Sequence, residues 1–155
     1  EGYDDRTFRP AAPVTRQAGV AFLTRLMDLP DAPAGPPTFS DVSPSHPFAA
    51  EIEAAAAAGM VEGYDDGTFR PGTTMTRQAF AAFLHRAAGS PAVPSPPDPT
   101  FPDVGFAHPF SDEIEWLAHT GLTDGYPDGT FRPAALVTRQ AAAAQLHRYA
   151  DAFIP

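Results

Sequence analysis

The sequence contains neither cysteine nor lysine, so arginine supplies all 10 of its basic side chains. Without cysteine the chain cannot form disulfide scaffolds, thiolate zinc sites or cysteine nucleophiles. Long apolar runs are missing as well, because the longest, such as Ala54–Ala58, fall far short of the ~20 residues that a membrane-spanning helix needs. We therefore expect no insertion into a membrane.

Positive charge is scarce overall: 10 basic residues stand against 19 acidic ones, and the formal net charge is −9. Proteins that bind nucleic acid need a basic face to neutralise phosphates, so this balance argues against a nucleic-acid partner. Proline and phenylalanine are plentiful instead, with 19 and 12 copies among 155 residues, of which 43% are hydrophobic. This length and composition suit one ordinary domain or a few small units.

The chain repeats itself. The run Gly-Tyr-Asp-Asp-Gly-Thr-Phe-Arg-Pro at 63–71 recurs with small changes at 125–133 and at 2–10. A Thr-Arg-Gln-Ala motif follows each copy, whereas Phe-x-Asp-Val precedes only the second and third copies, at Phe39–Val42 and Phe101–Val104. The first unit thus lacks its front half, from which we expect the chain to be a fragment of a longer protein.

Proline-rich stretches separate the units and are typical of semi-rigid spacers. They divide the chain into five predicted parts: the second half of a first repeat (1–29), a linker (30–37), a second repeat (38–89), a second linker (90–99) and a third repeat (100–155).

Each complete unit has the pattern of helix, loop and helix. Pro47 and Pro109 suit the first turn of the first helix, and Gly59 and Gly121 suit its end. The threonine of Thr-Arg-Gln-Ala is a typical N-cap for the second helix. One unit has too little apolar surface to fold alone, so we expect neighbouring units to share a core.

The arginine of that motif has an unfavourable position. If the threonine caps the helix, Arg16, Arg77 and Arg139 face the positive end of the helix dipole, which costs about 0.3–1 kcal/mol each. An anion held between the guanidinium and the N–H groups of the first turn would compensate. An internal ion pair with Asp41 or Asp103 would do the same, and the two interpretations are compatible.

Other residues that suggest chemistry have structural interpretations. The Asp-Gly pairs predict tight turns, because the further oxygen ligands of a calcium loop are absent. His46 and His108 stand at helix starts, where a capping or surface role is expected, and Trp116 is expected in the core or between units. No catalytic motif is present, and we predict no catalytic residue, no metal site and no cofactor.

The order of the motifs resembles the S-layer homology (SLH) repeat of bacterial surface proteins. The resemblance implies a mainly α fold, in which helix-loop-helix units pack with pseudo-threefold symmetry around a central helix bundle, with short extended segments in the loops. It also implies a non-catalytic module at the bacterial cell wall, outside the cell. Such a module anchors a surface protein by non-covalent recognition of an acidic, peptidoglycan-associated secondary cell-wall polysaccharide in grooves between repeats.

The groove arginine of the family falls on Arg16, Arg77 and Arg139. The remaining candidate ligand-binding residues are its neighbours in the motif, the front-half aspartate and the helix-ending glycine: Thr76, Thr138, Gln78, Gln140, Asp41, Asp103, Gly59 and Gly121. The sequence departs from the family pattern in reading Thr-Arg-Gln-Ala for Thr-Arg-Ala-Glu, and His-Pro-Phe for His-Trp. The alternative hypothesis is a structural, self-association or protein-interaction module of the cell surface without a glycan ligand, in which the repeats bind one another or another surface protein. The incomplete first repeat is the expected place of any self-association.

Overall fold

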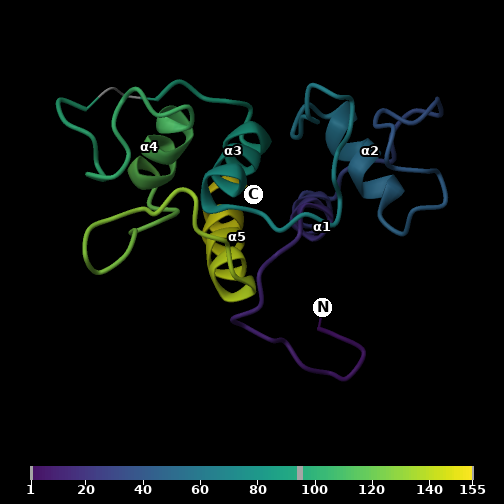
Figure 1. The fold of residues 1–155 in the computed structure, drawn as a ribbon, viewed down its shortest axis with the longest axis horizontal. Helices are drawn as coiled ribbons and strands as arrows, with labels where there is room; N and C mark the ends of the chain where they lie inside the picture. The colour runs from purple at the N-terminus through teal and green to yellow at the C-terminus, as the bar shows by residue number, and fades with distance from the viewer. Residues whose placement is uncertain (1, 94–95, 155) are drawn as a thin grey trace.

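The computed structural model describes residues 2–93 and 96–154, so both chain ends and residues 94 and 95 of the predicted second linker lie outside the described part. This part forms α1 (Arg16–Leu26), α2 (Ala49–Ala57), α3 (Arg77–Ala87), α4 (Ser111–His119) and α5 (Arg139–Phe153), joined by long loops (Figure 1). The predicted mainly helical fold is confirmed. None of these helices combines the length and the apolar character that a membrane crossing requires.

The longer helices α1, α3 and α5 begin as predicted at a threonine cap. Thr15, Thr76 and Thr138 each have extended backbone geometry just before the helix. Each hydroxyl oxygen accepts a hydrogen bond from the N–H of the alanine three residues on, at 3.3–3.4 Å. This bond satisfies one of the N–H groups that a helix start leaves without an intrahelical partner.

The shorter helices begin later than the sequence predicts. α2 begins at Ala49 and not at Pro47, because residues 43–48 form separate turns first. In these turns the His46 Nδ1 accepts from the Phe48 N–H at 3.2 Å, and the His46 carbonyl oxygen accepts from the Ala49 N–H. α4 likewise begins after Pro109.

The glycine stops of these helices are confirmed. Gly59 has a φ of +69° just after α2, a backbone conformation that glycine adopts at no steric cost. There the Met60 N–H donates to the Ala55 carbonyl oxygen and the Gly59 N–H to the Ala56 carbonyl oxygen, which closes the last turn. Gly121 ends α4 in the same way.

Extended segments just before α1, α3 and α5 join the units in a closed cycle of backbone hydrogen bonds. The Val14 N–H donates to the Val137 carbonyl oxygen at 3.0 Å, Val137 to Met75 at 2.9 Å, and Met75 to Val14 at 2.8 Å. The cycle brings the starts of the three longer helices together at one place. The pseudo-threefold packing of the units around a central helix bundle stays a prediction.

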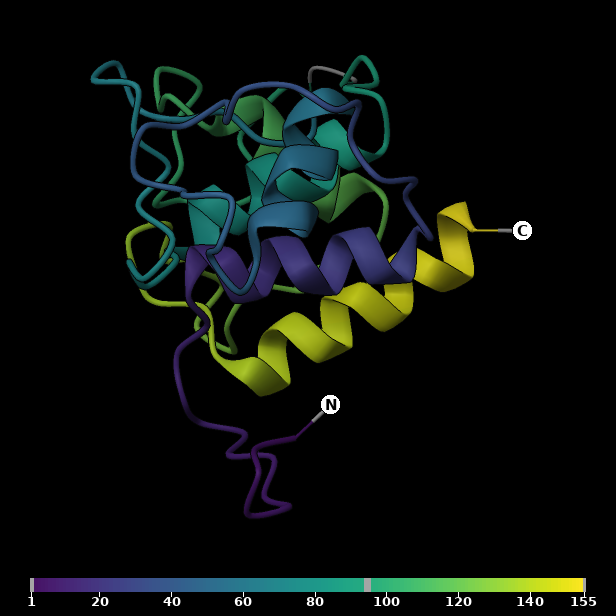
Figure 2. The ribbon, with the colours of Figure 1, turned by 90° about the vertical axis from the view of Figure 1, so that its right-hand side faces the viewer.

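The apolar core is shared between units, as predicted. α2 packs on α1 and α4 packs on α3, so the first helix of each complete unit contacts the second helix of the unit before it (Figure 1). α1 and α5 lie side by side (Figure 2). Trp116 on α4 is only 3% exposed and packs between His85 on α3 and Phe153 on α5, which confirms its expected place between units.

Candidate functional site

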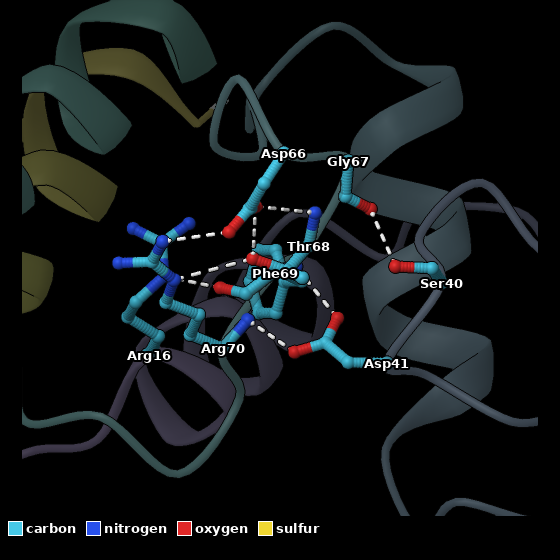
Figure 3. A network of polar contacts seen from close by, with 8 residues as sticks. All are labelled: Arg16, Ser40, Asp41, Asp66, Gly67, Thr68, Phe69 and Arg70. Atoms are coloured by element: carbon cyan, nitrogen blue, oxygen red, sulfur yellow. Dashed lines mark hydrogen bonds and ion pairs between the residues drawn. The ribbon is translucent and has the colours of Figure 1, made fainter.

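The Gly-Tyr-Asp-Asp-Gly-Thr-Phe-Arg-Pro loop is folded around an aspartate. The Asp66 carboxylate accepts from the N–H and the hydroxyl of Thr68, and it pairs with the Arg70 guanidinium at 2.9 Å (Figure 3). Gly67 takes the positive φ expected of a tight turn, +74°. The Arg70 guanidinium also covers the ring of Tyr64 at 3.8 Å. The third unit repeats the arrangement around Asp128.

These hydrogen bonds stabilise the ionised carboxylate. The Thr68 hydroxyl, followed by the Arg70 guanidinium, lowers the pKa of Asp66 from 3.8 to about 2. A lowered pKa in the folded state adds stability that is fully present above the unfolded value and is lost as the pH falls through the folded value.

We therefore expect the free energy of unfolding to decrease as the pH is lowered from 3.8 towards 2, with Asp66 contributing to the decrease. Denaturant unfolding at a series of pH values measures this decrease in the free energy of unfolding. The Asp66→Asn variant should show a shallower decrease over this interval, whereas Asp65→Asn, a change at the exposed neighbouring residue, should retain the wild-type slope. Identical slopes for Asp66→Asn and the wild type would contradict the prediction.

The front-half aspartate holds the same loop from the other side. The Asp41 carboxylate accepts from the Phe69 N–H and the Arg70 N–H, at 2.7 Å each (Figure 3). Asp103 accepts in the same way in the third unit, at 2.8 and 2.7 Å. The predicted internal ion pair with Asp41 or Asp103 is wrong for Arg16 and Arg77, because neither arginine pairs with a carboxylate in the described part of the chain and both aspartates bind backbone N–H groups instead.

The Arg16 side chain reaches from α1 into the loop of the second unit. Its Nε–H donates to the Phe69 carbonyl oxygen at 2.8 Å, and Nη2 donates to the Glu62 carbonyl oxygen at 3.1 Å. The guanidinium carbon lies 4.5 Å from the ring centroid of Phe69 and 5.1 Å from that of Tyr64. With 7% exposure, Arg16 is a buried cation held by carbonyl oxygens and aromatic faces.

The other motif arginines repeat this geometry. Arg77 donates from Nε to the Phe131 carbonyl oxygen at 2.8 Å, and Arg139 donates to the Phe8 carbonyl oxygen at 2.7 Å. Arg16 and Arg77 thus each contact the following unit, and Arg139, which belongs to the third unit, contacts the first. In the described part of the chain, no carboxylate forms an ion pair with Arg16 or Arg77.

The N–H groups of the first helical turn are not available to a ligand, which corrects the sequence-based anion hypothesis. The Arg16 N–H donates to the Thr73 carbonyl oxygen at 2.9 Å, and the Gln17 N–H donates to the Pro71 carbonyl oxygen at 3.0 Å. The next unit supplies these acceptors, and α3 and α5 have the same arrangement. Any anion at this place must therefore bind side chains.

A groove of about 400 Å³ lies beside Arg16 and draws on all three units. Arg16 comes from the first unit, and most of the wall comes from α3 and the loop before it. Of the candidate residues, Arg16, Thr76 and Gln78 meet here. The remaining candidates are absent from its lining: Arg77, Arg139, Thr138, Gln140, Asp41, Asp103, Gly59 and Gly121.

The groove residues that the sequence reasoning missed include Glu62, Tyr64, Arg86 and Phe110. Phe110 belongs to the His-Pro-Phe run that both complete units share, so its place in the repeat was a usable signal. Glu62 and Arg86 carried no signal, because no motif includes them and only the fold brings them beside Arg16.

The groove lining carries the positively charged side chains of Arg16 and Arg86. Burial, followed by repulsion from Arg70 and Arg86, lowers the pKa of Arg16, although an arginine this basic stays charged. Each of these two neighbours has its own carboxylate, on Asp66 and Glu62 respectively. A buried charge without an ion-pair partner attracts an anionic group strongly.

A second, more apolar hollow of about 330 Å³ lies between α1 and α5. Arg139, Phe8 and Leu146 are among its lining residues. Phe8 is 45% exposed, whereas its counterparts Phe69 and Phe131 are fully buried. Phe39 packs on Phe69, and Phe101 packs on Phe131. In the described part of the chain, no equivalent phenylalanine ring covers Phe8.

Comparison with known proteins identifies the same three repeated units. The family model of the S-layer homology domain matches residues 1–18, 38–81 and 100–143. The chain is 33% identical to cell surface glycoprotein 1 of Acetivibrio thermocellus over 95% of its length, and 30% identical to the cellulosome-anchoring protein of that organism over 96%. It is 31% identical to the amylopullulanase of Thermoanaerobacterium thermosulfurigenes over 95%. It spans 7%, 34% and 8% of these relatives, respectively.

Proposed function

Because the chain belongs to the S-layer homology family, we propose that it is a non-catalytic module that holds a surface protein on the cell wall. Its ligand is an acidic secondary cell-wall polysaccharide, bound in the groove between repeats. The observation that carries this proposal is the buried Arg16 guanidinium, which has no carboxylate partner in the described part of the chain and opens on a groove.

The groove offers complementary contacts to an acidic sugar. Arg16 and Arg86 bind its carboxylate or phosphate, and Gln78 offers amide donors and acceptors to hydroxyl groups. Tyr64 and Phe110 offer rings to the sugar face. The relative named a cellulosome-anchoring protein supports an anchoring role.

Long-range electrostatics works against this binding. The protein carries a formal charge of −9, so it repels an anionic polymer except at the local arginine cluster. Salt screens the exposed part of the cluster, and we expect binding to weaken as the ionic strength rises.

Sedimentation with purified walls of the producing organism tests the proposal. Wild-type protein should sediment with intact walls and should stay in solution after the non-peptidoglycan polymers are extracted. Arg16→Ala should lower the apparent affinity about tenfold or more, because it removes charged hydrogen bonds worth about 1.5–3 kcal/mol.

Gln140→Ala is the control, since Gln140 belongs to the same repeated motif but lies outside the groove lining and should leave the affinity unchanged. Thermal unfolding of each variant shows that it is folded. Sedimentation that survives polymer extraction, or a folded Arg16→Ala variant with unchanged affinity, would contradict glycan recognition.

Self-association is the second candidate function, and the exposed Phe8 beside the apolar hollow favours it. In that case, sedimentation velocity should show a dimer that Phe8→Ser disrupts. A concentration-independent monomer would exclude it.

A further inference from the structure

An ion pair lies in the lining of the groove. The Arg86 guanidinium on α3 contacts the Glu62 carboxylate at 2.8 Å, and both residues line the groove with Arg16. The Arg86 side chain is 24% exposed and that of Glu62 is 72% exposed. The third unit repeats the pair, with Arg148 and Asp124 at 2.8 Å.

Glu62 contacts both groove arginines. Its carbonyl oxygen accepts from Arg16 Nη2 at 3.1 Å, while its carboxylate accepts from Arg86 Nη2 at 2.8 Å. Among the described residues that line the groove, Glu62 carries the only carboxylate, and this carboxylate is bound to Arg86. An anionic ligand that reaches Arg86 therefore finds the Glu62 carboxylate already bound there.

Arg16 keeps free hydrogen-bonding capacity in the groove. Its protein partners use Nε and Nη2. Among the described residues, no fully buried side-chain nitrogen or oxygen lacks a hydrogen-bond partner. The Nη1 group of Arg16 is consequently open to solvent, and it can donate to a ligand.

The two cations differ in how firmly the protein holds them. Arg16 is fixed by buried hydrogen bonds and aromatic contacts. The Arg86–Glu62 pair is exposed on its acidic side, and such pairs contribute only about 0–1 kcal/mol. Displacing the Glu62 carboxylate from Arg86 therefore costs little free energy. A Glu62 carboxylate that stayed in place would repel an incoming anion at short range.

We propose that Glu62 is an internal competitor of the ligand: its carboxylate occupies Arg86 in the free protein and gives way to an anionic group that binds between Arg16 and Arg86. The inference rests on the proposed function and deepens it. Glu62 makes the groove selective for anionic glycans. When the Glu62 carboxylate leaves Arg86, a carboxylate or phosphate of the ligand takes its place as the negative partner, whereas a neutral glycan cannot. Glu62 thus sets the affinity without being a required ligand contact.

The test uses the soluble acidic polymer extracted from the walls, with calorimetric titration into the intact protein. Glu62→Gln should bind this polymer about three- to tenfold more tightly than the wild type, since a weak exposed ion pair no longer has to be broken. Asp98→Asn is the matched control, because it removes the same formal charge at an exposed linker residue away from the groove. It should change the affinity less than about twofold.

Arg86→Ala completes a double-mutant cycle. It should weaken binding, and in the Arg86→Ala background Glu62→Gln should bring no gain, because the cation for which Glu62 competes is gone. Equal gains from Glu62→Gln and Asp98→Asn, or a gain that persists without Arg86, would overturn the inference.

The cycle separates this inference from the proposed function. Wild-type binding that Glu62→Gln leaves unchanged refutes only the competitor role. Absence of binding by the wild type and by Glu62→Gln refutes glycan recognition and the inference together. The same polymer with its carboxylates chemically reduced should bind weakly to both proteins.

Discussion

Replacing Phe69 with alanine is expected to lower the free energy of unfolding by about 3–5 kcal/mol, the usual cost of truncating a fully buried phenylalanine. Phe69 has 0% exposure, its ring lies 5.1 Å from that of Phe39, and it supports the Arg16 guanidinium at 4.5 Å. The change leaves a cavity where two units meet and removes an aromatic face from a buried cation. Urea denaturation followed by circular dichroism measures the loss.

The repeat supplies an internal control for this prediction. Phe8 occupies the same motif position but is 45% exposed. Phe8→Ala should therefore cost less than about 1 kcal/mol, since little apolar surface returns to water. Similar costs at Phe8 and Phe69 would show that the units do not share the core that the structure describes.

The second large effect is expected at Asp41. Asp41→Ala should lower the free energy of unfolding by about 2–3 kcal/mol, because two N–H groups lose a charged acceptor at 2.7 Å. Asp41→Asn keeps one carbonyl oxygen as an acceptor and should cost less. Thermal or urea unfolding measures the free energy of unfolding of both variants and of the wild type.

Asp65→Ala is the control for this effect, because Asp65 is an exposed aspartate of the same loop. It should change the stability by less than about 0.5 kcal/mol. Wall binding of Asp41→Ala should also weaken, since Asp41 fixes the loop whose carbonyl oxygens position Arg16. An Asp41→Ala variant as stable as Asp65→Ala would contradict the role of this carboxylate.

Features that depend on a few neighbouring residues could be predicted from the sequence. The threonine caps at Thr15, Thr76 and Thr138, and the glycine stops at Gly59 and Gly121, follow from hydrogen-bonding groups within one helical turn. The core shared between units followed from the repeat itself. Burial of Trp116 between units followed from its place beside an apolar stripe.

Features that depend on distant partners were missed. The Asp41 carboxylate binds N–H groups 28 and 29 residues away, and nothing in its own motif identifies them. The first-turn N–H groups of α1 were expected to be open, but carbonyl oxygens of another unit occupy them. Arg70 has a φ of +57°, which its pairing with Asp66 and its packing on Tyr64 stabilise. Short-range propensity disfavours this conformation for arginine.

The hydrogen-bond cycle through Val14, Met75 and Val137 limits how such a protein can grow. In an open stack of repeats, each added copy finds a free end to pack on, so the number of copies varies freely. Here the segment of the third unit already bonds back to that of the first, 123 residues earlier in the chain, at 3.0 Å. The three segments already bond to one another, so a fourth copy would find no free N–H group in this cycle.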